Sequence, residues 1–89
     1  MMTHDLDEKL LQRIIDMIRK CARLLDPGEE VLPERPLREV GVDSFGLVDL
    51  LVMLEDELDI VLPDDLLTPE MFESAATIAV AVTSVLTAG

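Results

Sequence analysis

A run of apolar residues between Leu47 and Leu58 places hydrophobic side chains on two sides of one predicted helix. At about 100° per residue, one set forms an ordinary core stripe, which comprises Leu47, Leu50, Leu51, Leu54 and Leu58. A second set lies nearly opposite and comprises Phe45, Val48 and Val52. A helix that is apolar on two faces is either fully buried or carries a binding patch. Because a chain this short covers little of its own surface, we interpret the second set as a docking surface.

Acidic residues flank this second set at Asp49, Glu55 and Asp56. Unpaired charges are rarely buried, so these residues also favour exposure. The whole chain has 7 basic and 19 acidic residues, a formal net charge of −12. That charge disfavours nucleic acid and anionic membranes as partners, because both attract Lys and Arg. We therefore expect the docking surface to meet a basic protein surface.

The helix is preceded by an aspartate and begins with a serine. Asp43 is a good N-cap, because its carboxylate can accept a hydrogen bond from a first-turn amide and suits the positive end of the helix dipole. Ser44 then occupies the first helical position, with its hydroxyl towards solvent. Taken alone, this pair is more typical of a plain helix cap, with the second apolar set packed under a loop. The other features of the chain are needed to distinguish a plain helix cap from a modification site.

Two glycines lie close to this serine. Gly41 predicts a tight turn before the cap. Gly46 falls in the first turns of the helix, where glycine costs about 1 kcal/mol relative to alanine. It either leaves room for a molecule that approaches Ser44 or allows close helix packing, and the sequence favours neither.

The remaining segments predict an all-α fold. Phe45 and Phe72 are the only aromatic residues, while hydrophobic residues make up 49% of the chain. A core of Leu, Ile, Val, Ala and Met favours helices over sheets. The helical segments are predicted at 5–25, 44–58, 68–72 and 74–86. Residues 1–89 would then form one domain, a small four-helix bundle with a long loop between helices 1 and 2 and a short third helix.

Local signals support these boundaries. Asp5 and Glu8 resemble a capping pair, and Pro27-Gly28 is expected to end the first helix. Thr68-Pro69-Glu70 has the composition of a helix start, and Ser74 is a candidate cap for the last helix. The apolar residues expected to hold the long loop against the bundle are Leu32, Leu37 and Val40.

Other chemistry is disfavoured by the lone cysteine and the lone histidine. Cys21 lies on the apolar stripe of the first helix, so we expect a buried structural thiol in a reducing compartment. His4 is expected to be exposed and without a role, which leaves no metal-binding constellation. No signal peptide and no apolar run of membrane-spanning length are visible, so the cytoplasm is the expected location.

Taken together, these features resemble the acyl or peptidyl carrier protein family. The residues that carry the resemblance are Leu37-Arg38-Glu39-Val40-Gly41-Val42-Asp43-Ser44, which match the Leu-x-x-x-Gly-x-Asp-Ser segment of the family. Further matches are Leu50, Leu54, Glu55-Asp56, Ile60, Pro63 and Thr77-Ile78. The chain departs from the family at Phe45 and Leu58. Its Ser44-Phe45-Gly46 and Thr68-to-Phe72 segments are more similar to discrete aminoacyl-type carriers, including D-alanyl carriers, than to those of fatty-acid synthesis.

The resemblance implies that a phosphopantetheinyl transferase attaches 4′-phosphopantetheine from coenzyme A to Ser44. The arm would hold an acyl or aminoacyl group as a thioester, loaded by a ligase or adenylation enzyme and passed to a synthase or transferase in biosynthesis. The docking surface would comprise Phe45, Val48, Asp49, Val52, Glu55 and Asp56. We expect a free-standing, monomeric carrier that is not itself an enzyme, since no His is placed to activate Ser44. The alternative is an acidic helical protein-interaction module without a prosthetic group.

Overall fold

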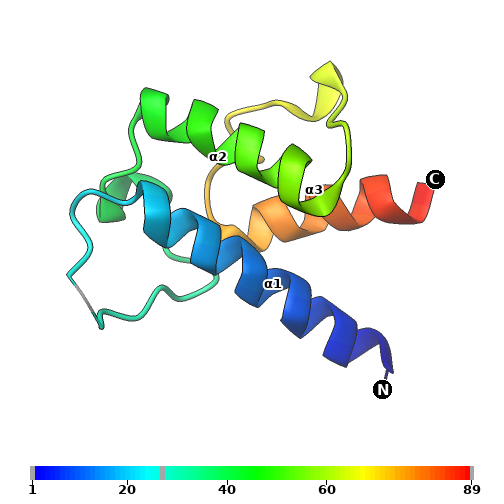
Figure 1. Cartoon of the computed structure of the whole chain (residues 1–89), viewed down its shortest axis with the longest axis horizontal. Helices are drawn as coiled ribbons and strands as arrows, with labels where there is room; N and C mark the ends of the chain where they lie inside the picture. Colours follow the sequence, from blue (N-terminus) through cyan, green and yellow to red (C-terminus); the bar gives the residue numbers. More distant parts are fainter. Residues whose placement is uncertain (1, 27, 89) are drawn as a thin grey trace.

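The computed structural model describes residues 2–26 and 28–88, and the side chains of 8–26 and 28–87. Three α-helices and two short 3₁₀ helices follow one another along the chain (Figure 1). Their bounds are α1 Met2–Cys21, η1 Leu37–Val40, α2 Ser44–Leu58, η2 Asp64–Leu66 and α3 Ala75–Ala88. No strand occurs in these ranges, so the prediction of an all-α fold is confirmed. No helix in the described part of the chain has the length and apolar character needed to cross a membrane.

The prediction of a four-helix bundle is wrong, because the expected helix at 68–72 is a turn. Thr68 does act as a cap, since its hydroxyl oxygen accepts a hydrogen bond from the Met71 amide at 3.2 Å. The Met71 amide also donates to the Thr68 carbonyl at 3.1 Å, which is an i→i+3 bond. The Glu73 amide repeats this pattern with Glu70 at 3.3 Å. Such bonds close single turns and do not propagate an α-helix.

The first helix begins earlier than predicted. It starts at Met2, so Asp5 lies inside the helix and does not precede it. The expectations for the side chain of His4 and for Pro27 lie outside the described residues.

The first helix also ends earlier than predicted, at Cys21 and not at Leu25. The Leu24 amide donates to the carbonyl of Val40 at 3.0 Å, a residue in the long loop. The Leu24 amide therefore donates its hydrogen bond to the long loop and not to a carbonyl in the last turn of α1. A tertiary hydrogen bond thus fixes the end of α1.

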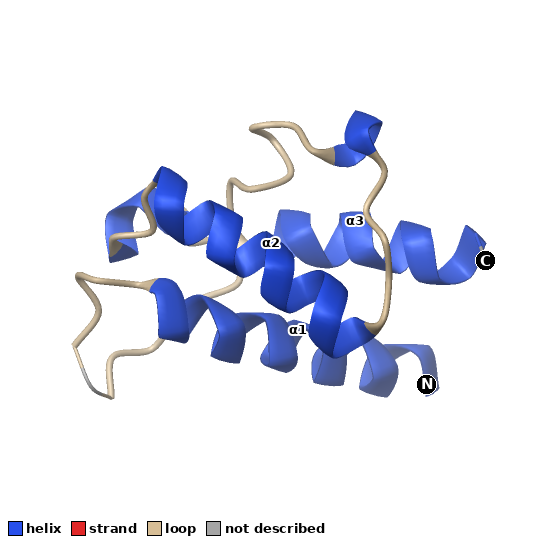
Figure 2. Cartoon of the chain, turned by 45° about the horizontal axis from the view of Figure 1, so that its top comes forward, coloured by secondary structure: helices blue, strands red, loops and turns tan. Residues whose placement is uncertain are grey.

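The core lies where α1 packs against both α2 and α3 (Figure 2). Its fully buried large side chains come from all three helices and from η1, and they are Ile14, Met17, Ile18, Val40, Leu50, Leu54, Ile78 and Val82. The predicted core stripe of α2 is confirmed in its centre, at Leu50 and Leu54. The other stripe residues, Leu47, Leu51 and Leu58, are partly buried against this core. Side chains that touch many neighbours in this way supply most of a small domain's stability.

The long loop is held to the bundle by a set of residues that differs partly from the predicted one. Leu37 and Val40 are buried, as expected. Leu32 is 55% exposed, so the prediction for this residue is wrong, and the neighbouring Val31 is buried in its place. Of these two neighbouring side chains, Val31 is the one that packs in the core. Val42 is the other buried loop residue near α2.

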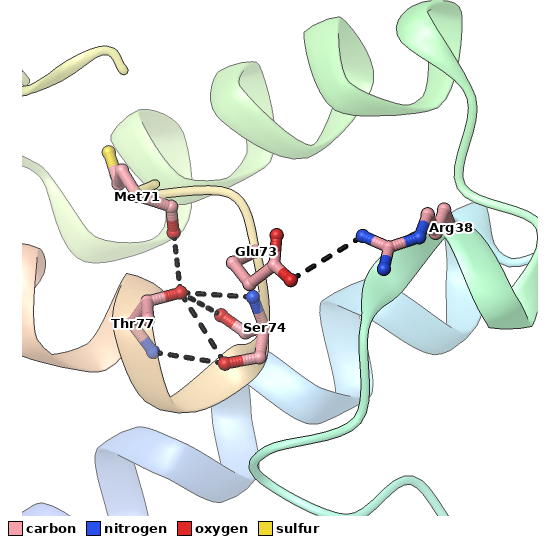
Figure 3. A network of polar contacts seen from close by, with 5 residues as sticks. All are labelled: Arg38, Met71, Glu73, Ser74 and Thr77. Carbon is pink, nitrogen blue, oxygen red and sulfur yellow. Dashed lines mark hydrogen bonds and ion pairs between the residues drawn. The ribbon is translucent and has the colours of Figure 1, made fainter. Parts of the chain in front are cut away.

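The start of α3 is built on a compact polar network around Ser74 (Figure 3). The Ser74 amide donates to the Thr77 hydroxyl oxygen at 2.9 Å, and the Thr77 amide donates to the Ser74 hydroxyl oxygen at 3.4 Å. This reciprocal pair is a capping box with Thr in the place of the usual Glu or Gln. The Thr77 hydroxyl also donates to the Met71 carbonyl at 2.8 Å. The predicted cap at Ser74 is therefore confirmed.

This network is joined to the loop that precedes α2. The Leu37 amide donates to the Glu73 carbonyl at 3.0 Å, and the Arg38 guanidinium lies 3.4 Å from the Glu73 carboxylate (Figure 3). The Ala76 amide donates to the Pro33 carbonyl at 2.8 Å. The loop is thus tied to Glu73, just before α3, and to Ala76 in the first turn of α3, and these bonds hold η1 in place.

Candidate functional site

The start of α2 is fixed by Asp43. Its backbone is extended, and its Oδ1 accepts a hydrogen bond from the Gly46 amide at 2.9 Å. The Leu47 amide donates to the Asp43 carbonyl at 2.8 Å, the first bond of the helix. Both contacts are those of an N-cap aspartate, so the predicted cap is confirmed.

Ser44 is the first residue of α2 and is exposed. Among the described residues, no side chain or backbone group makes a hydrogen bond with its hydroxyl. Free amides and the helix dipole make this end of α2 favourable for a negatively charged group. An accessible hydroxyl at such a position fits a phosphodiester, which needs both an open approach and compensation for its charge.

Gly41 sets the path of the chain into this cap. Its φ is +87°, a left-handed conformation that favours glycine. A Cβ at this position would lie 2.5 Å from the Leu24 amide nitrogen and 3.0 Å from that of Arg23. The turn predicted at Gly41 is confirmed, and the glycine also lets the chain after α1 pass against the chain before α2.

Gly46 is buried and serves close packing between helices. A Cβ there would lie 3.2 Å from the Val42 side chain and 3.5 Å from the Cys21 carbonyl oxygen, which belongs to the end of α1. At about 100° per residue, Gly46 also lies on the side of α2 away from Ser44. Of the two roles considered for Gly46, the structure supports close packing.

The predicted docking surface is exposed. Phe45, Val48 and Val52 are 77%, 60% and 59% exposed. Asp49 and Asp56 are exposed on the same helix. Three large apolar side chains held in water on one face of a rigid helix form an apolar patch of the kind that binds partners.

Glu55, included in the predicted docking surface, has a role inside the fold. It is partly buried, and its Oε2 accepts a hydrogen bond from the Leu62 amide at 2.9 Å. This bond ties the segment after α2 back onto the helix. The observed contact of Glu55 is therefore structural, and its part in docking stays a prediction.

Two further apolar residues are exposed, although the sequence did not predict it. Leu24 is 70% exposed and contacts the turn at Gly41, although it falls within the helix predicted for 5–25. Val61 is 79% exposed in the segment after α2. Helical spacing places Leu24 beside the apolar stripe of the predicted first helix, and Val61 belongs to no periodic pattern, so the sequence indicated the exposure of neither residue.

Cys21 lies at the junction between α1 and α2 and is partly buried, where the sequence predicted a buried thiol. Burial raises the pKa of the Cys21 thiol, and the negative charge of Asp49 raises it further. Both effects favour the neutral thiol, so Cys21 is a poor nucleophile. No group of three potential metal-ligating side chains lies together in the part of the chain that the structure describes.

Comparison with known proteins settles the family. The family model described as the phosphopantetheine attachment site matches residues 12–82, a segment that includes Asp43 and Ser44. The chain belongs to this carrier-protein family. Its prosthetic group is phosphopantetheine, so the alternative of an acidic interaction module without a prosthetic group is not retained.

Relatives of this carrier are named for aminoacyl groups. It is 31% identical over 71 residues to aminoacyl carrier protein 2 of Bradyrhizobium diazoefficiens, which is 80% of each chain. It is 32% identical over 65 residues to the aminoacyl carrier protein of Agrobacterium fabrum, which is 73% of this chain and 78% of that one.

Solved structures share the fold of this carrier. One is a crystal structure of an engineered Bradyrhizobium japonicum glycine:[carrier protein] ligase complexed with a carrier protein from Agrobacterium tumefaciens and ATP. The match has a TM-score of 0.74 at 29% identity and covers 84% of this chain and 97% of the matched chain. Another is the B. japonicum ligase complexed with glycylated carrier protein, with a TM-score of 0.66 at 25% identity over 85% and 97% of the two chains.

Proposed function

We propose that Ser44 carries the phosphopantetheine arm and that this carrier presents an aminoacyl group to partner enzymes. The observation that carries the proposal is the exposed Ser44 hydroxyl, at a capped helix start, beside an exposed apolar face with acidic neighbours. When bound, the arm supplies a terminal thiol that holds the cargo as a thioester.

The protein's own contribution is presentation. Asp43 fixes the start of the helix. Gly41 and the buried loop residues fix the path of the chain into this start, and so the place where Ser44 is presented on the bundle. A tether of this kind raises the effective concentration of the cargo at each partner. Phe45 and Asp56 belong to the surface that partners with basic patches would recognise.

The aminoacyl cargo is supported by the names of the relatives and by the ligase complexes that contain similar chains. The partners we propose are a phosphopantetheinyl transferase, an aminoacyl-loading ligase and a downstream synthase or transferase. Each partner would contribute the catalytic groups, because no described side chain hydrogen-bonds the Ser44 hydroxyl to act as its base. The protein itself would act as a monomeric, non-catalytic carrier.

A mass measurement tests the proposal. The protein is incubated with coenzyme A, magnesium and a broad-specificity phosphopantetheinyl transferase, and its intact mass is determined. The native chain should gain one phosphopantetheine, and Ser44→Ala should gain none. Ser84→Ala is the matched control, because Ser84 is also exposed but lies on α3, and it should gain the group normally. Equal gain by Ser44→Ala and the native chain would overturn the assignment.

A further inference from the structure

A shallow hollow lies directly beside the start of α2. It has a volume of about 360 Å³, and its lining residues are Arg23, Leu24, Arg38, Gly41, Val42 and Asp43. These residues come from the chain after α1, from η1 and from the cap of α2, which meet at one end of the molecule (Figure 1). Because Asp43 precedes Ser44 directly, any group attached to Ser44 starts at the rim of this hollow.

The hollow carries two exposed cations in a strongly acidic protein. The side chains of Arg23 and Arg38 are 71% and 73% exposed. Each is paired with one acidic neighbour: Arg23 Nε lies 3.9 Å from the Asp43 carboxylate, and Arg38 Nη1 lies 3.4 Å from the Glu73 carboxylate. In contrast, Arg35 is 29% exposed and lies 2.7 Å from its carboxylate partner. Because both side chains are largely exposed and a guanidinium has five donors, each arginine can bind a further anion while it keeps its acidic partner.

Arg23 is the better placed of the two. It belongs to the same short stretch as Leu24, whose amide is bonded to the loop before α2, so its backbone is fixed relative to the cap. Its guanidinium already reaches the carboxylate of Asp43, the residue before Ser44. A guanidinium has five donors in a planar fork and can bridge a carboxylate and a phosphate oxygen.

The hollow also offers apolar surface. Leu24 is 70% exposed on one wall, and the buried Val42 and the side-chain-free Gly41 lie next to it. The part of a phosphopantetheine arm nearest the phosphate carries two geminal methyl groups, which favour such a surface.

We propose that Arg23 positions the phosphodiester on Ser44 and that the hollow seats the first part of the arm against Leu24. The proposal rests on the proposed attachment at Ser44. A phosphodiester there adds a negative charge next to Asp43, and Arg23 offsets the repulsion between the two. The arm then leaves Ser44 towards the end of α1, which keeps the apolar patch of α2 open to partners.

Nuclear magnetic resonance of the arm-loaded protein tests this. Native protein, Arg23→Gln and the control Lys20→Gln are converted with coenzyme A and the transferase, and the mass gain of each is verified. Lys20 is a matched control, because it is an exposed cation on α1, 3.7 Å from an acidic partner, but it does not line the hollow. Contacts are then measured as nuclear Overhauser effects from the geminal methyls of the arm.

We expect contacts to the Leu24 methyls, together with a shift of the Arg23 Nε–H resonance on loading. Both should persist in Lys20→Gln, and the contacts should weaken or vanish in Arg23→Gln. Contacts to Val48 and Val52 instead, no contacts at all, or unchanged contacts in Arg23→Gln would overturn the proposal. A missing mass gain in native protein would overturn the attachment at Ser44 itself, so the two failures are distinguishable.

Discussion

Replacement of Gly41 by alanine tests how the chain leading to Ser44 is held. Gly41 has a φ of +87°, and an added Cβ would lie 2.5 Å from the Leu24 amide nitrogen. Neighbouring backbone cannot move aside as cheaply as the end of a flexible side chain. We therefore expect Gly41→Ala to open the contact between the chain after α1 and the loop before α2.

The magnitude follows from two contributions. A left-handed backbone conformation costs an L-residue about 1–2 kcal/mol relative to glycine. Separation of the segment after α1 from the loop before α2 removes the 3.0 Å hydrogen bond from the Leu24 amide to the Val40 carbonyl. Such a bond is worth about 0.5–1.5 kcal/mol. The sum is about 1.5–3.5 kcal/mol, a large part of the roughly 5–15 kcal/mol that stabilises a typical domain.

Gly28→Ala is the matched control. Gly28 has nearly the same φ, +88°, but an added Cβ would meet nothing within 4 Å. Its replacement should cost only the conformational contribution of about 1–2 kcal/mol.

Urea denaturation followed by circular dichroism measures the free energy of unfolding of both variants. Gly41→Ala should lose about 1 kcal/mol more than Gly28→Ala, the value of the additional hydrogen bond. Equal losses in the two variants would refute the role we assign to the close approach at Gly41.

Three further predictions concern the core, the docking surface and acid stability. Leu54→Ala should lower the free energy of unfolding by about 2–5 kcal/mol, because it leaves a cavity in the core. Val52→Ala, on the exposed face, should change it by less than about 0.5 kcal/mol. Similar losses for the two variants in urea denaturation would mean that the two faces of α2 are reversed. Asp56→Lys should lower kcat/KM for the transferase or the loading ligase while helicity stays unchanged, and unchanged kinetics would count against an acidic docking surface. A hydrogen bond from Arg35 lowers the pKa of Glu29 from its ordinary value of 4.5. The ionised carboxylate therefore stabilises the folded protein at a pH above its unfolded pKa. This stability is lost as the pH falls through the folded pKa. When the pH is lowered from neutral to acidic, the free energy of unfolding should therefore fall less for Arg35→Gln than for the native chain. An equal fall for both proteins in urea denaturation would contradict this.

The site was largely predictable from the sequence because it depends on local rules. The cap at Asp43 needs only an acceptor side chain at the right position, and the position of Ser44 follows from it. The two apolar faces of α2 follow from helical periodicity alone, and Leu50, Leu54 and Phe45 lie where that periodicity predicts.

The features that escaped prediction depend on contacts between distant segments. The end of α1 is set by the bond between Leu24 and Val40, which are far apart in the sequence. The choice between Val31 and Leu32 for the core depends on which of the two side chains the tertiary structure turns towards the bundle. The turn that begins at Thr68 has correct capping chemistry, but its amides make only i→i+3 bonds. Two of these features, the bond at Leu24 and the burial of Val31, follow from tertiary contacts that propensity does not encode.

The most direct test of the account is the location of phosphopantetheine on the modified protein. No Lys or Arg follows Arg38, so trypsin leaves residues 39–89 as one fragment that contains Ser44, Ser74 and Ser84. Tandem mass spectrometry of this fragment should place the whole added mass on Ser44. The added mass on either of the other two serines would contradict the central claim.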